Sequence, residues 1–112
     1  GFKWAINTQP NIRVAILISS IVLLFCAYLT SINLLSATEL IFTLFCIFII
    51  FIAELLNTGI EAINDEVAKG EYKDLVRISK DVSSAAVTGA VILAFCVGLI
   101  IFLPKIQVLF NL

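Results

Sequence analysis

Three long apolar stretches divide the chain, and polar residues gather between the second and third of them. Residues 14–35 and 82–103 each contain 22 positions without a charged side chain. About 20 apolar residues span a bilayer as an α-helix, so each stretch predicts one transmembrane helix. Residues 40–53 add 14 uncharged positions, which are too few to span alone. The helical pattern continues to Asp65, so the second predicted span carries ionisable groups in its later half.

These stretches predict an all-α membrane protein that forms a single membrane domain over residues 1–112. The aromatic residues near the beginning suggest a short interfacial segment that anchors at the membrane surface. The expected elements are an interfacial helix over 1–11, transmembrane helices over 12–35, 39–65 and 80–103, and a loop over 66–79. Pro104 follows the third span at a point where a helix can end.

The basic residues predict the orientation in the membrane. Lys3 and Arg13 precede the first span, and four more Lys or Arg residues lie within 65–81. The turn at 31–39 has none. Positive-inside logic therefore places the amino terminus and the 66–79 loop in the cytoplasm and the carboxyl terminus outside, with Lys105 as an exception.

Composition narrows the class of protein further. Hydrophobic residues make up 62% of the chain, whereas soluble domains are nearer half apolar. The net charge of −1 argues against a nucleic-acid partner. The absence of histidine removes the commonest general base and zinc ligand, so acid–base chemistry would fall to carboxylates, lysine or tyrosine.

Four polar residues of the second span share one face of the predicted helix. At 100° per residue, a sector of about 80° holds all of them: Glu54, Asn57, Glu61 and Asp65. A charge at membrane depth costs at least about 2.5–3.5 kcal/mol, and such groups usually carry function. Carboxylate oxygens bind Mg²⁺ together with substrate phosphates. Glu54, the deeper carboxylate, is the candidate base for a lipid hydroxyl, and Glu61 is the candidate metal ligand.

The beginning of the predicted third helix adds charges on the same side of the membrane. Lys80 and Asp81 stand there, and a lysine beside exposed helix amides is a reasonable phosphate site. Asp65 and Lys80 are also compatible with ordinary interfacial charges at helix ends. The sequence contains no GxxxxGK[ST] loop, so a nucleotide would bind without a standard phosphate cradle.

Two functions other than catalysis are compatible with these residues. A cation or proton conduit would use Glu54 and Glu61 as a relay, but it predicts polar residues continuing towards the outer leaflet. Residues 40–53 offer only Thr43 and Cys46 there, which favours a one-sided interfacial site. A small subunit of a membrane complex would instead pair these carboxylates with basic residues of its partner.

Two runs of residues carry a resemblance to a known family. The run from Glu54 to Asp65 resembles the signature of the prokaryotic diacylglycerol kinase family, E-x-x-N-[ST]-x-I-E-x-x-x-D. The run from Lys80 to Val87 is similar to that family's K-D-x-x-[SA]-x-A-V. Both motifs occur in the right order, with three spans, and the resemblance covers essentially the whole chain.

The resemblance implies a multi-pass kinase of the bacterial inner membrane that uses ATP and Mg²⁺ to phosphorylate a lipid alcohol. It also implies a homotrimer whose active sites lie between subunits on the cytoplasmic side. By motif position, Glu54 would be the catalytic base and Glu61 a magnesium ligand. The nucleotide-binding residues would be Asn57, Asp65, Lys80 and Asp81.

The amino-terminal segment departs from the family pattern. Family members usually have a Glu four residues before an Arg, as a second metal ligand. Counting back from Arg13 reaches Gln9, whose neutral amide would be a weaker magnesium ligand. Family members also carry a further surface segment, ahead of the position of Gly1, that helps to cover the nucleotide.

The resemblance points to two lipid substrates. The run 84–87 is similar to the diacylglycerol kinase branch, so we expect diacylglycerol to be converted to phosphatidic acid. Asn57, Thr58 and the run 98–105 are similar to the undecaprenol kinase branch. Undecaprenol, converted to undecaprenyl phosphate, is therefore the alternative substrate.

Overall fold

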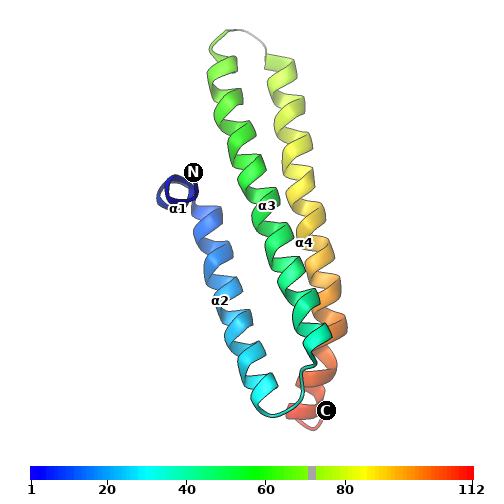
Figure 1. The fold of residues 1–112 in the computed structure, drawn as a ribbon. Coiled ribbons are helices and arrows are strands. Elements are labelled where there is room, and N and C mark those ends of the chain that lie inside the picture. The colour runs from blue at the N-terminus through cyan, green and yellow to red at the C-terminus, as the bar shows by residue number, and fades with distance from the viewer. Residues whose placement is uncertain (71–72) are drawn as a thin grey trace.

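The computed structural model describes residues 1–70 and 73–112, and this part of the chain folds into four helices. Figure 1 shows their order: α1 (Phe2–Thr8), α2 (Pro10–Ser31), α3 (Ala37–Ala68) and α4 (Lys73–Leu109). The three longer helices are each long and apolar enough to span a membrane. The predicted fold class is therefore confirmed: an all-α protein with three long apolar helices and a short amino-terminal helix.

The junction between α1 and α2 turns the chain sharply. Gln9 has an extended backbone, with φ −113° and ψ 107°, and so separates the two helices. Pro10 occupies the first turn of α2, where its fixed φ suits a helix and its missing N–H costs nothing. α1 therefore lies across the axis of α2 (Figure 1). Phe2 reaches α3, where its ring centroid is 6.4 Å from that of Phe51.

A short turn joins α2 to α3 at the opposite end of the bundle. Asn33 adopts a φ of 60°, a left-handed conformation that Asn tolerates better than most residues. Ser36 then caps α3: its hydroxyl accepts the Glu39 backbone N–H, and the Glu39 carboxylate accepts the Ser36 N–H. This reciprocal capping box satisfies two amides that the first turn of a helix would leave unpaired.

The structure places several helix ends differently from the predicted bounds. α2 covers Pro10–Ser31 and α3 covers Ala37–Ala68, and most of the predicted 66–79 loop is helical, because α4 already begins at Lys73. Exposed polar side chains can point to water while their backbone makes helical hydrogen bonds. Polar composition alone was therefore not a reliable sign of a loop at these residues. The backbone amides around Lys80 lie inside α4, so the prediction of exposed helix amides at this position is wrong.

Pro104 does not end the third long helix, which continues to Leu109. Proline removes one backbone hydrogen bond, but this loss is tolerated in membrane helices when neighbouring helices support the segment. Lys105, the next residue, forms an ion pair of 2.8 Å with Glu39 at the start of α3. This contact attaches the end of α4 to the neighbouring helix.

The three long helices meet most closely at the end that holds the α2–α3 turn. An apolar core lies there, made of buried side chains from α2, the turn and α4: Cys26, Leu29, Leu35 and Ile101. Phe25 and Phe102 pack beside it, with ring centroids 5.8 Å apart. α3 and α4 pack against each other along much of their length, whereas α2 has fewer contacts with α3.

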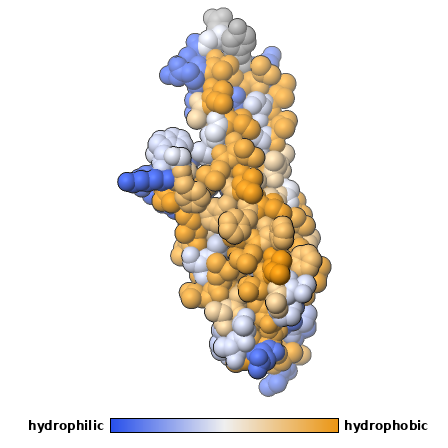
Figure 2. All heavy atoms as spheres, in the orientation of Figure 1, coloured by the Kyte–Doolittle hydropathy of each residue, from blue (hydrophilic) through white to orange (hydrophobic). Residues whose placement is uncertain are grey.

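The outer surface of the bundle is largely apolar. Figure 2 shows hydrophobic residues over the middle of this face and polar residues towards both ends and at α1. Large apolar side chains on the long helices, such as Leu24 and Ile100, are exposed. Lipid is the natural solvent for such a surface, so the chain is a multi-pass membrane protein.

A candidate active site along one face of α3

The four polar residues predicted to share one helical face all lie on α3, but they face different neighbours. α3 is continuous from Ala37 to Ala68, so its helical geometry keeps the side chains on one side over about three turns. The first of them, Glu54, borders a groove that also involves α2 and α4. The other three make hydrogen bonds to one another or to α4.

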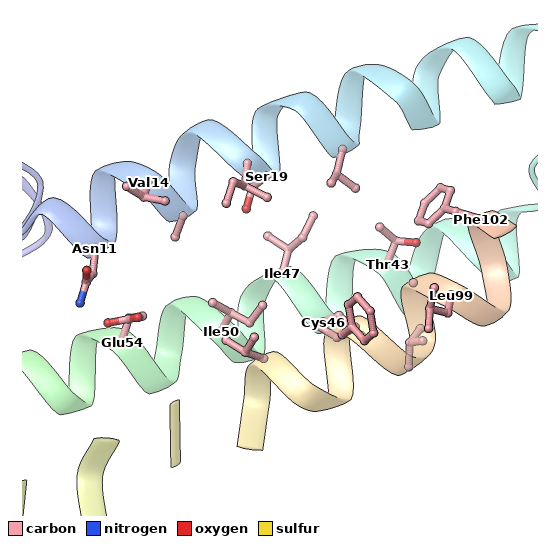
Figure 3. Close-up of a pocket in the computed structure, with 18 residues that line it drawn as sticks. Asn11, Val14, Ser19, Thr43, Cys46, Ile47, Ile50, Glu54, Leu99 and Phe102 are labelled. Carbon is pink, nitrogen blue, oxygen red and sulfur yellow. The ribbon is translucent and has the colours of Figure 1, made fainter. Parts of the chain in front are cut away.

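Glu54 stands at one end of this groove. The groove has a volume of about 550 Å³, and Glu54 is partly buried at its edge. Asn11 on α2 lines the same end, and Figure 3 shows the Asn11 and Glu54 side chains extending into the space between α2 and α3. An amide and a carboxylate therefore form the polar end of the groove.

The rest of the groove is almost entirely apolar. Its lining spans residues 11–22 on α2, 43–54 on α3 and 91–102 on α4. Eleven helical steps on each helix correspond to about 16 Å. Apart from Asn11 and Glu54, the side chains in this lining that carry a polar atom or sulfur are three small ones: Ser19, Thr43 and Cys46. At its far end, Phe102 belongs both to the groove and to the aromatic pair beside the apolar core.

Asn57, Glu61 and Ser83 form a hydrogen-bonded chain between α3 and α4. The Ser83 hydroxyl donates to Asn57 Oδ1 over 2.8 Å. Asn57 Nδ2 in turn donates to Glu61 Oε1 over 3.2 Å, one helical turn further along α3. Asn57 and Ser83 are buried, and Glu61 is partly exposed. The predicted grouping of Asn57 with Glu61 is therefore present in the structure.

A second set of contacts links α3 to α4 nearer the end of the bundle. Asn64 is buried and its Nδ2 donates to the Ser79 hydroxyl over 3.1 Å. Lys80 Nζ lies 3.1 Å from Asp65 Oδ1, and both side chains are substantially exposed. The structure thus brings together Asp65 and Lys80, two of the residues predicted to bind the nucleotide.

Asp81 and Gln9 are not joined to these contacts. Asp81 is exposed on α4, and its backbone carbonyl accepts the Ser84 hydroxyl. Gln9 lies at the α1–α2 junction and is partly buried. Within residues 1–70 and 73–112, no three Asp, Glu or Cys side chains form a group that could hold a metal ion.

Sequence reasoning attached no role to Asn11, Asn64 or Ser79, although each lies among the candidate residues. Asn64 is seven residues after Asn57, and this two-turn spacing could have extended the polar face. Ser79 and Ser83 are four residues apart, a spacing that places both on the side of α4 facing α3. Asn11 carries no such signal, because its proximity to Glu54 depends on how α2 packs.

Comparison with known proteins identifies relatives of this chain. A family model described as prokaryotic diacylglycerol kinase matches residues 1–102. A protein named diacylglycerol kinase from Synechocystis sp. (strain ATCC 27184 / PCC 6803 / Kazusa) is 31% identical over 106 residues. The match covers 95% of this chain and 58% of that relative, so the chain spans a little over half of its length. No solved structure gives a significant match.

Proposed function

We propose, for a chain that belongs to the prokaryotic diacylglycerol kinase family, an ATP- and Mg²⁺-dependent kinase activity that converts diacylglycerol to phosphatidic acid. The observation that carries this proposal is the position of Glu54, a carboxylate at the polar end of an apolar groove between membrane helices. A lipid alcohol has the matching shape, because its chain is apolar and its reactive hydroxyl lies at one end. The named relative supports the same class of reaction.

The dimensions of the groove favour diacylglycerol over undecaprenol. The groove is about 16 Å long, and one leaflet of the hydrocarbon core is about 15 Å deep. One of the two acyl chains of diacylglycerol fills one leaflet, so its length matches the groove from Glu54 to Phe102, and the second acyl chain would lie in the surrounding lipid. The apolar core closes the bundle beyond Phe102. The much longer polyprenyl chain of undecaprenol would have to leave the groove into the surrounding lipid.

Glu54 would accept the proton of the lipid hydroxyl as the hydroxyl oxygen bonds to the γ-phosphorus of ATP, while the bond to the bridging β-phosphate oxygen breaks and ADP leaves. A positioned general base of this kind contributes about 10²–10⁴-fold to the rate. Asn11, at the same end of the groove, would hydrogen-bond the lipid near its hydroxyl and hold it beside Glu54. Because phosphoryl transfer depends mainly on positioning and charge stabilisation, few side chains are needed.

Glu61 fits the role of a magnesium ligand. Its Oε1 accepts from Asn57, and the structure records no partner for its Oε2 within the described residues. Mg²⁺ commonly binds one or two carboxylates together with substrate phosphates, so a single carboxylate can serve when ATP supplies the other oxygens. When bound, the ion neutralises charge on the transferring phosphate. Gln9, a neutral amide, would be at most a weak further ligand.

The exposed end of the α3–α4 pair would hold the nucleotide. Lys80 can attract the phosphates, and its ion pair with Asp65 holds its ammonium group at this exposed end of the two helices. Asp81 lies next to Lys80 on the exposed side of α4, where it can contact the nucleotide. More Lys and Arg residues lie at this end than at the α2–α3 turn, and this bias supports a cytoplasmic orientation, where ATP is available.

One chain leaves this site open, which supports assembly with neighbouring chains, and the family resemblance implies a homotrimer with active sites between subunits. Glu54 borders the α2–α3–α4 groove, whereas Glu61 and Lys80 lie on the α3–α4 pair. A neighbouring chain would cover the nucleotide and complete the metal site. A cation conduit is less favoured, because the groove beyond Glu54 is lined mainly by apolar side chains.

The experiment that tests the proposal is phosphate transfer from ATP by the purified, detergent-solubilised protein. Diacylglycerol and undecaprenol are offered separately, with and without Mg²⁺. We expect Mg²⁺-dependent formation of phosphatidic acid and slower phosphorylation of undecaprenol. Faster transfer to undecaprenol would reverse the substrate assignment. A folded oligomer that transfers phosphate to neither lipid would refute the kinase proposal.

A further inference from the structure

We propose that Ser83 is a positioning residue that orients the Asn57 amide and, through it, the carboxylate of Glu61. The inference rests on the kinase function proposed above, because it gives Glu61 its role as a metal ligand. Ser83 belongs to α4, whereas Asn57 and Glu61 belong to α3. The orientation of the metal ligand would therefore depend on how these two helices pack.

The two hydrogen bonds fix which way the Asn57 amide points. A carboxamide has an acceptor oxygen on one side and a donor NH₂ group on the other. Ser83 donates to Asn57 Oδ1 over 2.8 Å, so the NH₂ group faces the opposite way, where it donates to Glu61 Oε1 over 3.2 Å. If the amide were reversed, its oxygen would face the carboxylate and the two acceptors would repel each other.

The burial of this pair makes the Ser83 bond difficult to replace. Ser83 is 7% exposed and Asn57 is 8% exposed, so water has little access to either side chain. The Ser83 hydroxyl also lies 3.1 Å from the Lys80 carbonyl, but its single proton favours the shorter contact with Asn57. Without that hydroxyl, Asn57 Oδ1 would lose its donor among the described residues, and the amide could rotate away from Glu61.

A rotated amide would release the Glu61 carboxylate from its present orientation. Residues that hold a metal ligand through a hydrogen bond typically contribute 10–100-fold to metal affinity or activity. Ser83 is one hydrogen bond further from Glu61 than Asn57 is, so we expect an effect on metal affinity near the lower end of that range.

The test measures metal binding rather than turnover. Mn²⁺ replaces Mg²⁺ as a paramagnetic probe, and its binding is titrated by electron paramagnetic resonance with a non-hydrolysable ATP analogue present. Ser83→Ala is expected to weaken Mn²⁺ binding about ten-fold. Thr88→Val is the matched control, because the Thr88 hydroxyl is exposed and bonds the Ser84 carbonyl of its own helix. It should bind Mn²⁺ like the unchanged protein.

Two further variants separate positioning from a general effect on packing. Ser83→Thr keeps the hydroxyl, and a neighbouring cavity of about 620 Å³ offers room for the added methyl group, so it should retain Mn²⁺ binding. In an Asn57→Ala background, Ser83→Ala should weaken binding no further, because the residue through which it acts is gone. The oligomeric state and thermal unfolding of every variant are measured alongside.

The possible results distinguish this inference from the kinase proposal. Unchanged Mn²⁺ binding in Ser83→Ala would refute the role of Ser83 but not the kinase proposal. The same conclusion follows if Ser83→Ala weakens Mn²⁺ binding as much in the Asn57→Ala background as in the unchanged protein. If Ser83→Ala does not fold, a folded Ser83→Thr variant that has lost Mn²⁺ binding would refute it instead, and one that retains binding would support it. If the unchanged protein binds no Mn²⁺ with the nucleotide analogue, the proposed kinase site itself fails.

Discussion

The two ends of the helical bundle use their polar residues in different ways. At the end that holds the α2–α3 turn, Glu39 bonds both Ser36 and Lys105, and the Lys105 and Glu39 side chains are only 19% and 28% exposed. An apolar core of buried side chains lies in the same region. The polar groups there are paired within the chain and stabilise the fold.

In the second half of α3, carboxylates keep part of their bonding capacity available. Glu54 borders an open groove, and Glu61 has one oxygen bonded to Asn57. α3 thus carries carboxylates with different surroundings at its start and in its second half. In this chain, the two carboxylates proposed for catalysis and metal binding are those that the fold leaves incompletely paired, whereas Glu39 is held by Ser36 and Lys105.

Among the variants that test this comparison, a change at Glu54 should have the largest effect on turnover. Glu54→Gln should lower turnover at least about 100-fold, because it removes the proposed base while keeping the size of the side chain. The unfolding temperature should change little. Phosphatidic acid formation measures the loss, and Glu66→Gln on the exposed part of α3, where Glu66 pairs with Lys69, is the control. Turnover close to that of the unchanged protein would remove Glu54 from the catalytic role.

Glu61→Gln should affect the metal dependence more than the maximum rate. Loss of a charged ligand is expected to raise the Mg²⁺ concentration for half-maximal activity by about 10–100-fold. Turnover measured across a Mg²⁺ titration at saturating ATP and lipid gives this value. If the titration curve does not move, Glu61 does not bind the metal.

A smaller effect is expected from narrowing the groove. Gly98 lines it, and a side chain added at Gly98 would meet no atom within 4 Å at its Cβ position. Gly98→Leu should raise the KM for long-chain diacylglycerol about ten-fold, equivalent to about 1.4 kcal/mol, and leave the KM for ATP unchanged. Short-chain diacylglycerol should be affected less.

The matched control for the groove is Ala27→Leu, an added side chain on an exposed part of α2. It should leave both KM values unchanged, since residue 27 is not part of the groove lining. Equal increases for short and long acyl chains in Gly98→Leu would show that the groove does not hold the lipid chain, even if the kinase activity stands.

The sequence predicted the architecture better than it predicted the helix ends or the contacts between helices. Apolar run length determines whether a segment can span a bilayer, so the three long helices were predictable. The helix that includes residues 73–79 was missed, because polar composition at a membrane surface suits a helix as well as a loop. Pro104 was wrongly predicted to end the third long helix. The helix continues beyond it, where Lys105 pairs with Glu39 of the neighbouring helix.

The candidate site was predictable only as far as one helix determines it. The spacing of Asn57 and Glu61 placed them on one face, and the structure joins them by a hydrogen bond. The partners supplied by other helices, Ser83 from α4 and Asn11 from α2, depend on tertiary packing. The variants at Glu54, Glu61 and Ser83 test the catalytic and binding roles of these residues.

The smallest effect on activity is expected at the opposite end, where Lys105→Gln should leave turnover unchanged. Removing the ammonium leaves the partly buried Glu39 carboxylate without its ionic partner, and we expect a loss of about 1–2 kcal/mol of stability, between the values typical of exposed and fully buried pairs. Reversible unfolding in mixed detergent measures this loss. Glu39→Gln combined with Lys105→Gln should recover part of it, because the two neutral side chains can still hydrogen-bond. A fall in turnover without a change in stability would mean that the two ends of the bundle are coupled and that the contrast between them is too simple.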